Sequence, residues 1–438
     1  MTGRYALWLW AVRALWYAGL PLALAYLALR GRKDPAYLRH WGERFGFGPV
    51  LPGAVWVHAV SLGEMRSAVP LVRALLDRGE RVITTHLTPA GRGAAAAAFG
   101  PEIAARQLVA RYLPMEFGWA YRRFLRAGPK LALVMEIEVW PVMIAEAKRA
   151  GVPLYLANSQ YPARSFARDM KYLRWIGHPV QQVAGVLAKS AAHAARFTAL
   201  GARNVQVCGE LRFAQPIAPH LLAAAAALGM NRPVVTLASV VLGEDAGYVG
   251  LYQTVQADFR ARGLVPPLFV HVPRAPERFG AVGDLLAAAG QTVLRRSDVL
   301  DPALRGDAGA LAEADILLGD SLGEMYFYLA LADLVIVGGG FVPSGAHNII
   351  EPLALCKPVL VGPHVWSIEY PGEEAAEAGV LEVCATPQAM AGRVAALLAD
   401  PAALAAGSAR RAAFFAAHSG ATARILAALA PVLAQDDR

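Results

Sequence analysis

Glu64 is the residue that the sequence places best for acid–base chemistry. It follows an apolar run at residues 55–57, which predicts a buried strand, and a Ser-Leu-Gly turn at residues 61–63. An apolar spacing near 3.6 then predicts a helix that opens at Glu64. A strand-to-helix turn of this kind lies at the carboxyl edge of a parallel sheet, where such sheets bind ligands. Because a positive helix end lowers the pKa of a carboxylate, we expect Glu64 to be ionised at neutral pH and able to accept a proton. The alternative is that Glu64 only complements the helix dipole.

Two more carboxylates and a cation follow strands in the same half of the chain. Glu136 and Glu138 end the apolar run at residues 131–135, and Arg212 follows the run at residues 205–208. A carboxylate at the end of a buried strand is costly unless it has a partner or a function. Arg212 is expected near the same carboxyl edge, where a cation can stabilise a developing negative charge.

The second half contains two segments suited to binding a phosphate. Arg274 comes directly after an apolar run, and a guanidinium at a strand end can pair a phosphate through two hydrogen bonds. The alternative for Arg274 is an ordinary surface salt bridge. Residues 319–325 again combine a strand end, a glycine turn and a helix start, whose backbone N–H groups could meet a phosphate.

A glycine run at residues 338–340 leads into a polar turn around His347. Asn348 and Glu351 follow it, three residues apart on a predicted helix, so they would share a face and could bind sugar hydroxyls. His347 could instead simply cap the turn. The run is neither a P-loop nor a dinucleotide-binding fingerprint.

The elements that position these residues alternate between short apolar strands and helices from residue 55 onward. This pattern predicts parallel, doubly wound sheets. Residues 215–232 read as a linker, after which a second series of the same kind begins. We therefore expect an α/β fold of two Rossmann-like domains facing one another across a cleft. The expected boundaries are residues 1–33 for an N-terminal anchor, 34–220 for the first domain and 221–438 for the second.

The composition points to a membrane and to an anionic partner. Of the 438 residues, 56% are hydrophobic and 17% charged, and the formal net charge is +8. A basic excess suits phosphates or acidic headgroups. Because no zinc-finger spacing, basic zipper or aromatic single-strand-binding motif occurs, we do not expect nucleic acid as a partner. The three cysteines are scattered and odd in number, so we expect neither a disulfide framework nor a metal site, and no cofactor is expected.

Residues 5–29 form an almost wholly apolar stretch, which as a helix spans roughly 36 Å and could cross a bilayer. Arg13 interrupts it, and Arg30, Arg32 and Lys33 follow it at once. This basic flank favours a retained anchor at the cytoplasmic face over a cleaved signal peptide. The next segment, HWGERFG at residues 40–46, is basic and aromatic, as is typical of a membrane surface.

Taken in order, the motifs VHAVSLGE, MEIEVWP, GELRF, VPRAPERF, GDSLGE and GAHNIIEP resemble the Kdo (3-deoxy-D-manno-octulosonic acid) transferases of lipopolysaccharide synthesis. The apolar N-terminus and the HWGERFG segment are also similar to that family. The resemblance covers nearly the whole chain. It implies a GT-B glycosyltransferase fold and a metal-independent, inverting transfer from CMP-Kdo to the lipid A precursor. The implied place is the cytoplasmic face of the inner membrane.

The resemblance also assigns roles to residues. It implies that Glu64 is the catalytic base and that Glu136 and Arg212 stabilise the transition state. The implied CMP-binding positions are Pro273, Arg274, Leu322, Gly323, Glu324, Asn348, Ile349, Ile350 and Glu351.

Three positions depart from the family pattern. The family usually has Lys at the position of Arg212 and often has His at that of Val241, and Ala346 replaces a more usual Gly. The change at Val241 leaves a divergent donor specificity open. The rival hypotheses are another GT-B transferase or sugar-nucleotide epimerase with a different donor, and a non-catalytic membrane scaffold with a degenerate site. Assays with CMP-Kdo against UDP-sugars separate the first rival.

Overall fold

The computed structural model describes residues 3–434 and divides the chain into two compact units. Unit 1 contains the chain up to Gln215 and again from Ser419 onward, and unit 2 is Pro216–His418. The boundaries predicted from the sequence place all residues after 220 in the second domain. The final helix α21 (Ala421–Leu433) instead packs in unit 1, because its stripe of Ala421, Ile425 and Leu429 joins that unit's core.

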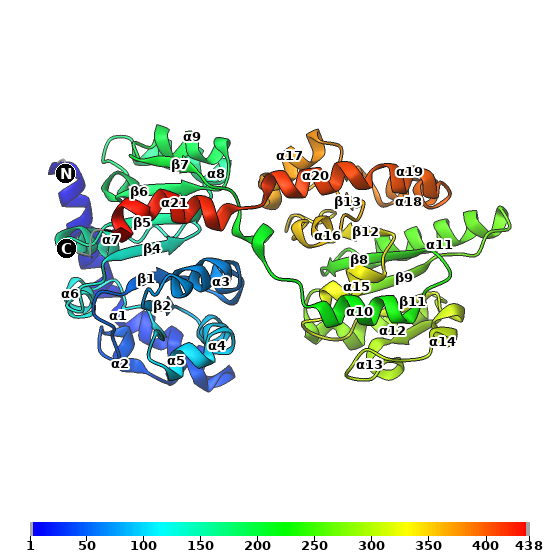
Figure 1. Ribbon diagram of the computed structural model, residues 1–438, viewed down its shortest axis with the longest axis horizontal. Helices are drawn as coiled ribbons and strands as arrows, with labels where there is room; N and C mark the ends of the chain where they lie inside the picture. Colours follow the sequence, from blue (N-terminus) through cyan, green and yellow to red (C-terminus); the bar gives the residue numbers. More distant parts are fainter. Residues whose placement is uncertain (1–2, 435–438) are drawn as a thin grey trace. The chain divides into compact units, whose positions relative to one another are not determined.

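Unit 1 is built on a seven-stranded, wholly parallel sheet in the order β3-β2-β1-β4-β5-β6-β7 (Figure 1). Most strand residues are apolar and buried because helices cover both faces of the sheet, and β4 and β6 are apolar throughout. Their bounds are β1 (Val55–His58), β2 (Val82–His86), β3 (Leu108–Tyr112), β4 (Leu131–Met135), β5 (Leu154–Ser159), β6 (Gly185–Ala188) and β7 (Val205–Val207).

The other helices of unit 1 lie between these strands in the chain. They are α2 (Trp41–Arg44), α3 (Leu62–Asp77), α4 (Pro89–Ala98), α5 (Gly100–Ala104), α6 (Gly118–Leu125), α7 (Pro141–Arg149), α8 (Ala163–Tyr172) and α9 (Ala191–Ala199), with 3₁₀ helices η1 (Pro35–Leu38), η2 (Pro179–Gln182) and η3 (Leu211–Ala214).

Unit 2 repeats the architecture with a second seven-stranded parallel sheet, in the order β10-β11-β9-β8-β12-β13-β14. Its last strand, β14, was not predicted from the sequence. The strands are β8 (Val234–Val240), β9 (Leu268–Pro273), β10 (Val293–Arg295), β11 (Ile316–Leu318), β12 (Leu334–Val337), β13 (Val359–Val361) and β14 (Leu381–Val383).

One helix of unit 2 lies in the segment 215–232, which the sequence predicts to be a linker. Helix α10 (Pro219–Leu228) buries Leu221, Ala225 and Leu228 in the core, so the segment is structured. The others are α11 (Asp245–Ala261), α12 (Phe279–Ala288), α13 (Arg296–Val299), α14 (Ala308–Glu313), α15 (Met325–Leu331), α16 (Ile350–Ala354), α17 (Glu369–Glu377), α18 (Pro387–Leu398), α19 (Pro401–Ala406) and α20 (Ser408–His418), with 3₁₀ helices η4 (Pro276–Arg278) and η5 (Trp366–Ile368).

Each sheet has a point where the strand order reverses. In unit 1 the reversal falls between β1 and β4, and in unit 2 between β8 and β12. A doubly wound sheet binds its ligand at such a point, outside the carboxyl ends of the strands. Glu64 follows β1, Glu136 follows β4, and the glycine run follows β12, so the predicted site residues cluster at these two reversals.

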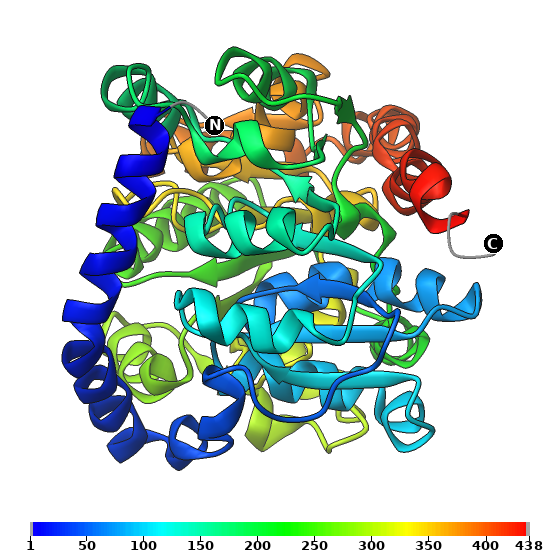
Figure 2. The same cartoon turned by 90° about the vertical axis from the view of Figure 1, so that its left-hand side faces the viewer.

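Helix α1 (Gly3–Lys33) runs along one side of unit 1 (Figure 2). One face packs on the unit through Tyr5, Leu9 and Leu27, and the Arg13 guanidinium pairs with Glu146 at 2.6 Å. The opposite face exposes large apolar side chains, with Leu22 76% exposed. By length and composition, both α1 and the stretch Pro401–Leu433 could cross a membrane, although the second is divided among α19, α20 and α21.

Candidate active site

The turn after β1 holds the Glu64 carboxylate in place. Ser61 caps α3, because its Oγ accepts the Glu64 N–H at 3.4 Å. In return, Glu64 Oε2 accepts the Val60 N–H at 2.7 Å and Oε1 accepts the Ser61 hydroxyl at 3.4 Å. This reciprocal arrangement is a variant of the capping box, so Glu64 does help to start the helix. The same bonds fix the orientation of its carboxylate.

The ionisation state of Glu64 differs from the expectation. Burial raises the pKa of Glu64 to about 7, and Glu138 and Glu136 add to the rise, while the bonds from Val60 and Ser61 oppose it. The prediction of a lowered pKa was wrong because loss of solvent outweighs the helix end. A carboxyl group with a pKa near 7 is well matched to accepting a proton at physiological pH.

Glu136 belongs to a buried ionic cluster at the ends of β4, β5 and β6. Lys189 Nζ lies 2.6 Å from Glu136 Oε2 and 2.7 Å from Glu210 Oε2. Asn158 Nδ2 donates to Glu136 Oε1 at 3.0 Å and to Glu210 Oε1 at 2.9 Å. A cation thus bridges two carboxylates, and an amide joins them a second time.

Within the cluster the pKa values of Glu136 and Glu210 shift in opposite directions. Burial raises the pKa of Glu136, and Lys189 only partly opposes this. Burial would also raise the pKa of Glu210, but Lys189 and Arg212 together hold it below its usual value. Glu136 and Asn158 both have left-handed backbone, with φ of 59° and 51°. Such strain in residues other than glycine is concentrated at functional sites.

Arg212 connects this cluster to the helix that carries Glu64. Its Nε donates to the hydroxyl of Ser67, on α3, at 3.0 Å. Its charge also opposes the rise in the pKa of Glu136 and helps to lower the pKa of Glu210. The structure therefore brings together the predicted residues Glu64, Glu136 and Arg212 at one edge of the unit 1 sheet. Glu138 lies there too, where its carboxylate accepts the Trp140 indole N–H at 2.7 Å.

Sequence reasoning missed Lys189, Glu210 and Asn158. Lys189 carries the same signal as Glu136, a charged residue directly after a fully apolar strand. It is 2% exposed, and a lysine buried to that extent needs carboxylate partners. Asn158 lies inside β5 and gave no comparable signal.

In unit 2, Arg274 and His347 form a pair. Arg274 Nη1 lies 2.8 Å from His347 Nδ1, and burial, with the Arg274 charge, lowers the pKa of His347 to about 4. The neutral ring accepts at Nδ1, so its proton lies on Nε2. That buried Nε2 has no hydrogen-bond partner within residues 3–434. Over the same range Arg274 makes no salt bridge, so that alternative does not hold. The His347 side chain bonds to Arg274, and a role of His347 in binding stays a prediction.

The glycine run is held by a residue outside the predicted set. The Glu244 carboxylate accepts the N–H groups of Gly339 at 2.7 Å, Phe341 at 3.1 Å and Val241 at 3.2 Å. These N–H groups are therefore occupied within the fold. A Cβ on Gly339 would lie 2.2 Å from the Gly345 oxygen, which explains why the loop needs glycine.

The remaining residues predicted to bind the CMP-sugar donor lie at or after strands of unit 2. They differ in their contacts and in their exposure to solvent. Glu324 pairs with Arg296 at 2.7 Å, Gly323 has a φ of 84°, and Leu322 is 73% exposed. We expected Asn348 on the same helix as Glu351, but Asn348 precedes α16. Its Oδ1 accepts the Ile350 N–H at 3.0 Å. The side chains of Pro273, Ile349 and Ile350 are buried.

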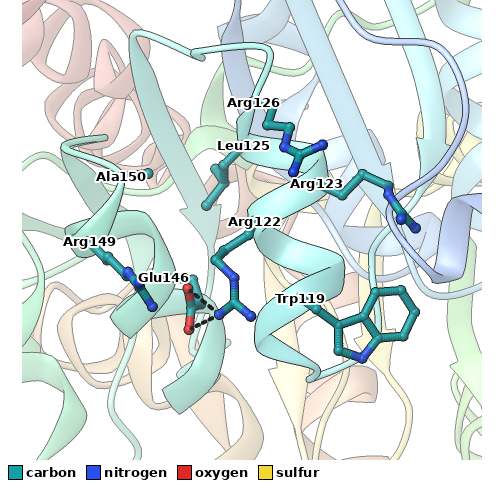
Figure 3. Close-up of a pocket in the computed structure, with 8 residues that line it drawn as sticks. All are labelled: Trp119, Arg122, Arg123, Leu125, Arg126, Glu146, Arg149 and Ala150. Carbon is teal, nitrogen blue, oxygen red and sulfur yellow. Dashed lines mark hydrogen bonds and ion pairs between the residues drawn. The ribbon is translucent and has the colours of Figure 1, made fainter.

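Unit 1 also has a basic pocket of about 590 Å³ between α6 and α7. Figure 3 shows Arg122 directed at the buried Glu146, which it approaches to 3.3 Å, with Arg149 on the other side of that carboxylate. Arg123 and Arg126 also line the pocket. Within the described residues, no group of three or more His, Cys, Asp or Glu side chains is arranged to hold a metal ion.

Comparison with known proteins places the chain in a family. A family model described as 3-deoxy-D-manno-octulosonic-acid transferase (kdotransferase) matches residues 39–215. A 3-deoxy-D-manno-octulosonic acid transferase of Bordetella pertussis is 41% identical over 387 residues, which are 86% of this chain and 87% of that protein. One of Haemophilus influenzae is 31% identical, over 86% of this chain and 88% of its own length.

A solved structure of similar fold supports the architecture. The putative UDP-N-acetylglucosamine 2-epimerase of Listeria monocytogenes superposes with a TM-score of 0.56 at 16% identity, covering 88% of this chain and 98% of that one. At that identity the likeness concerns the fold alone. The two parallel sheets agree with the GT-B class expected from the sequence. With the match to the B. pertussis enzyme, the chain belongs to the Kdo transferase family of glycosyltransferases.

Proposed function

We propose that this chain transfers Kdo from CMP-Kdo to lipid IVA, the phosphorylated lipid A precursor, at the cytoplasmic face of the inner membrane. Family membership supports Kdo transfer in lipopolysaccharide synthesis. The observation that carries the catalytic assignment is the Glu64 carboxyl group, held in the first turn of α3 by the Val60 N–H and with a pKa of about 7.

In the proposed reaction Glu64 accepts the proton of an acceptor hydroxyl as its oxygen bonds to the anomeric carbon of Kdo. The bond from that carbon to the CMP phosphate oxygen breaks, and CMP leaves with the electron pair. Attack opposite the leaving group inverts the anomeric centre. Glu136 and Arg212 belong to a charged cluster at the same edge of the sheet as Glu64. The fixed charges of this cluster can stabilise the transition state.

On the donor side we assign CMP to unit 2. Arg274 and the Nε2–H of His347 are hydrogen-bond donors without carboxylate partners in the described chain, so both suit the oxygens of a phosphate or of the Kdo carboxylate. The segments at Gly323 and Asn348–Glu351 would meet the nucleotide mainly through backbone and polar groups. Charge is then balanced by side chains, which is the basis for proposing a metal-independent transfer.

The membrane assignment rests on α1 and the surface near it. The outward face of α1 is apolar, and the basic pocket of Arg122, Arg123, Arg126 and Arg149 lies on the same unit. Apolar side chains inserted beside basic ones are typical of attachment to an anionic lipid surface. Because the inward face of α1 packs along unit 1, we propose that the helix lies in the membrane surface rather than crossing it alone.

Mass spectrometry of lipid IVA after incubation with CMP-Kdo and the purified protein tests the function. We expect a product heavier by one or more Kdo residues, with CMP released in proportion. UDP-N-acetylglucosamine serves as the control donor and should give no product. Turnover of that donor, without turnover of CMP-Kdo, would overturn the proposal.

A further inference from the structure

Unit 1 contains a second pocket, of about 330 Å³, between α1 and the body of the unit. Most of its lining side chains are apolar or aromatic. Trp16, Ala23 and Leu27 of α1 form one wall, and Leu87, Met115 and Trp140 lie among those that form the rest. The pocket is near the lower end of the size range of small-ligand sites, large enough for part of one acyl chain.

The pocket adjoins the turn that holds the proposed base. Val60 and Thr88 are among its lining residues. The Val60 N–H is the donor that fixes Glu64 Oε2, and the Thr88 hydroxyl donates to the Val60 oxygen at 3.3 Å. A molecule in the pocket would therefore contact Val60, the residue whose N–H holds the reacting carboxylate.

Arg44 gives the pocket a buried positive charge. It is 3% exposed and makes no salt bridge within residues 3–434. Its side chain donates to the Leu87 oxygen at a long 3.5 Å, and its guanidinium lies 4.0 Å from the Tyr112 ring centre. The neighbouring Glu43 is engaged elsewhere, with Arg92 and the Tyr112 N–H. A buried guanidinium with so few partners costs free energy unless an anion joins it.

Two other charged residues line the same pocket. Arg30, at the exposed end of α1, donates to the Tyr37 hydroxyl at 2.9 Å and adds a second cation. Glu116 is acidic, but both of its oxygens are occupied by the N–H groups of Val142, at 2.8 Å, and Met143, at 3.0 Å. The pocket therefore combines apolar walls with two cations, and its one carboxylate is turned to the start of α7.

We propose that this pocket is a subsite for the acceptor lipid, in which the apolar walls take part of one acyl chain and Arg44 pairs with a phosphate of the headgroup. The inference rests on the proposed function and adds to it the place where the lipid is held. It also gives a role to the HWGERFG segment, which contains Arg44 and has no part in the transfer chemistry. The outward face of α1 would meet the bilayer while its inward face receives the substrate.

A matched pair of substitutions tests the acyl site. Ala23→Phe fills the pocket, whereas Ala25→Phe makes the same change on the exposed face of α1 two residues away. We expect Ala23→Phe to raise the KM for tetra-acylated acceptor about tenfold or more, the scale of one lost buried apolar contact. Its kcat, and its KM for the deacylated disaccharide bisphosphate, should stay near wild type. Ala25→Phe should change none of them.

Arg44→Met, with the exposed Arg39→Met as control, tests the phosphate contact. We expect Arg44→Met to bind the bisphosphorylated lipid at least about tenfold more weakly, as for a lost charge-assisted hydrogen bond, and to bind a dephosphorylated lipid like wild type. Binding is measured by calorimetry in detergent without CMP-Kdo. A purely structural Arg44 predicts equal weakening for both lipids and a lowered melting temperature.

These outcomes separate the subsite from the proposed function. If the wild-type protein binds the lipid as described but transfers no Kdo, the function fails and the subsite stands. If Kdo is transferred but Ala23→Phe and Ala25→Phe behave alike, the acyl site is overturned. Binding of inorganic phosphate to Arg44, with no difference between acylated and deacylated acceptors, would also overturn it.

Discussion

At the scale of single residues, burial decides the chemistry of the candidate site. Helix α3 begins two residues before Glu64, yet desolvation raises the pKa of that carboxyl group to about 7. The position of Glu64 could be predicted from the sequence because the strand, the turn and the helix start are local patterns. Its acidity could not, because the desolvation and the neighbouring carboxylates come from β4 and the residues after it, far away in the chain.

The raised pKa predicts how activity depends on pH. Protonated Glu64 cannot accept the acceptor's proton, so kcat should fall about tenfold per unit as pH drops below roughly 6. Burial favours the protonated form in the folded state, so the associated stability is full below pH 4.5 and is lost as pH rises through about 7. Rate profiles and thermal melts between pH 5 and 9 measure both effects. A flat rate profile across pH 7 would contradict the assignment.

Arg274 provides a second test at this scale. Arg274→Ala should weaken CMP binding by about 1.5–3 kcal/mol, because a phosphate would lose a charge-assisted hydrogen bond. Calorimetry measures the change, and the exposed Arg262→Ala in the same unit is the control. Unchanged CMP affinity in a folded Arg274→Ala variant would remove Arg274 from the donor site.

At the scale of elements, the ionic cluster holds together the carboxyl ends of three neighbouring strands. Glu136 follows β4, Asn158 lies in β5 and Lys189 follows β6, so the cluster forms only when those strands pair in register. The strands themselves could be predicted, because β4 and β6 are short apolar runs bounded by polar residues and β5 begins as one. Which charges pair across strands could not, since that depends on the order of the strands in the sheet.

The cluster predicts a large cost for removing its cation. Lys189→Met leaves Glu136 and Glu210 facing each other in a buried site, so we expect the free energy of unfolding to fall by about 3–5 kcal/mol. Denaturant unfolding measures it at neutral pH, with the exposed Lys148→Met as control. A loss no greater than that of the control would show that the cluster does not stabilise unit 1.

Two helices show where local patterns are insufficient. Proline and alanine dominate the sequence of α10 and predict a linker, but the segment is helical because Leu221, Ala225 and Leu228 pack in the core of unit 2. The position of α21 in the chain predicts that it belongs to the second domain, but its apolar stripe packs in unit 1. In both cases the deciding partner is distant in the chain.

At the scale of the whole molecule, α1 has two faces with different partners. The inward face packs on unit 1 and neutralises Arg13 through Glu146, so the charge that interrupts the apolar stretch needs no contact with lipid. The outward face leaves Leu7, Leu15, Leu22 and Leu29 exposed. Contiguous exposed apolar side chains of this kind mark a membrane or protein contact.

A substitution on the outward face of α1 tests the membrane anchor without disturbing the inward face, which packs on unit 1. The double change Leu15→Glu and Leu22→Glu should greatly reduce flotation of the protein with vesicles of anionic phospholipid, because two charges would have to enter the bilayer surface. The melting temperature should stay near that of wild type. Val265→Glu, at an exposed apolar position of unit 2, is the control. Full flotation of the double variant at high salt would rule out the anchor.

The most direct test of the central claim is the turnover of Glu64→Gln, which keeps the shape of the side chain and removes its basicity. The account predicts a loss of kcat for Kdo transfer of about 10²- to 10⁴-fold, as for a positioned general base, with CMP affinity and the melting temperature near wild type. The exposed Glu313→Gln should behave like the parent protein. Near-normal turnover in a folded Glu64→Gln variant would contradict the account and would move the search for the base to Glu136 or Glu138.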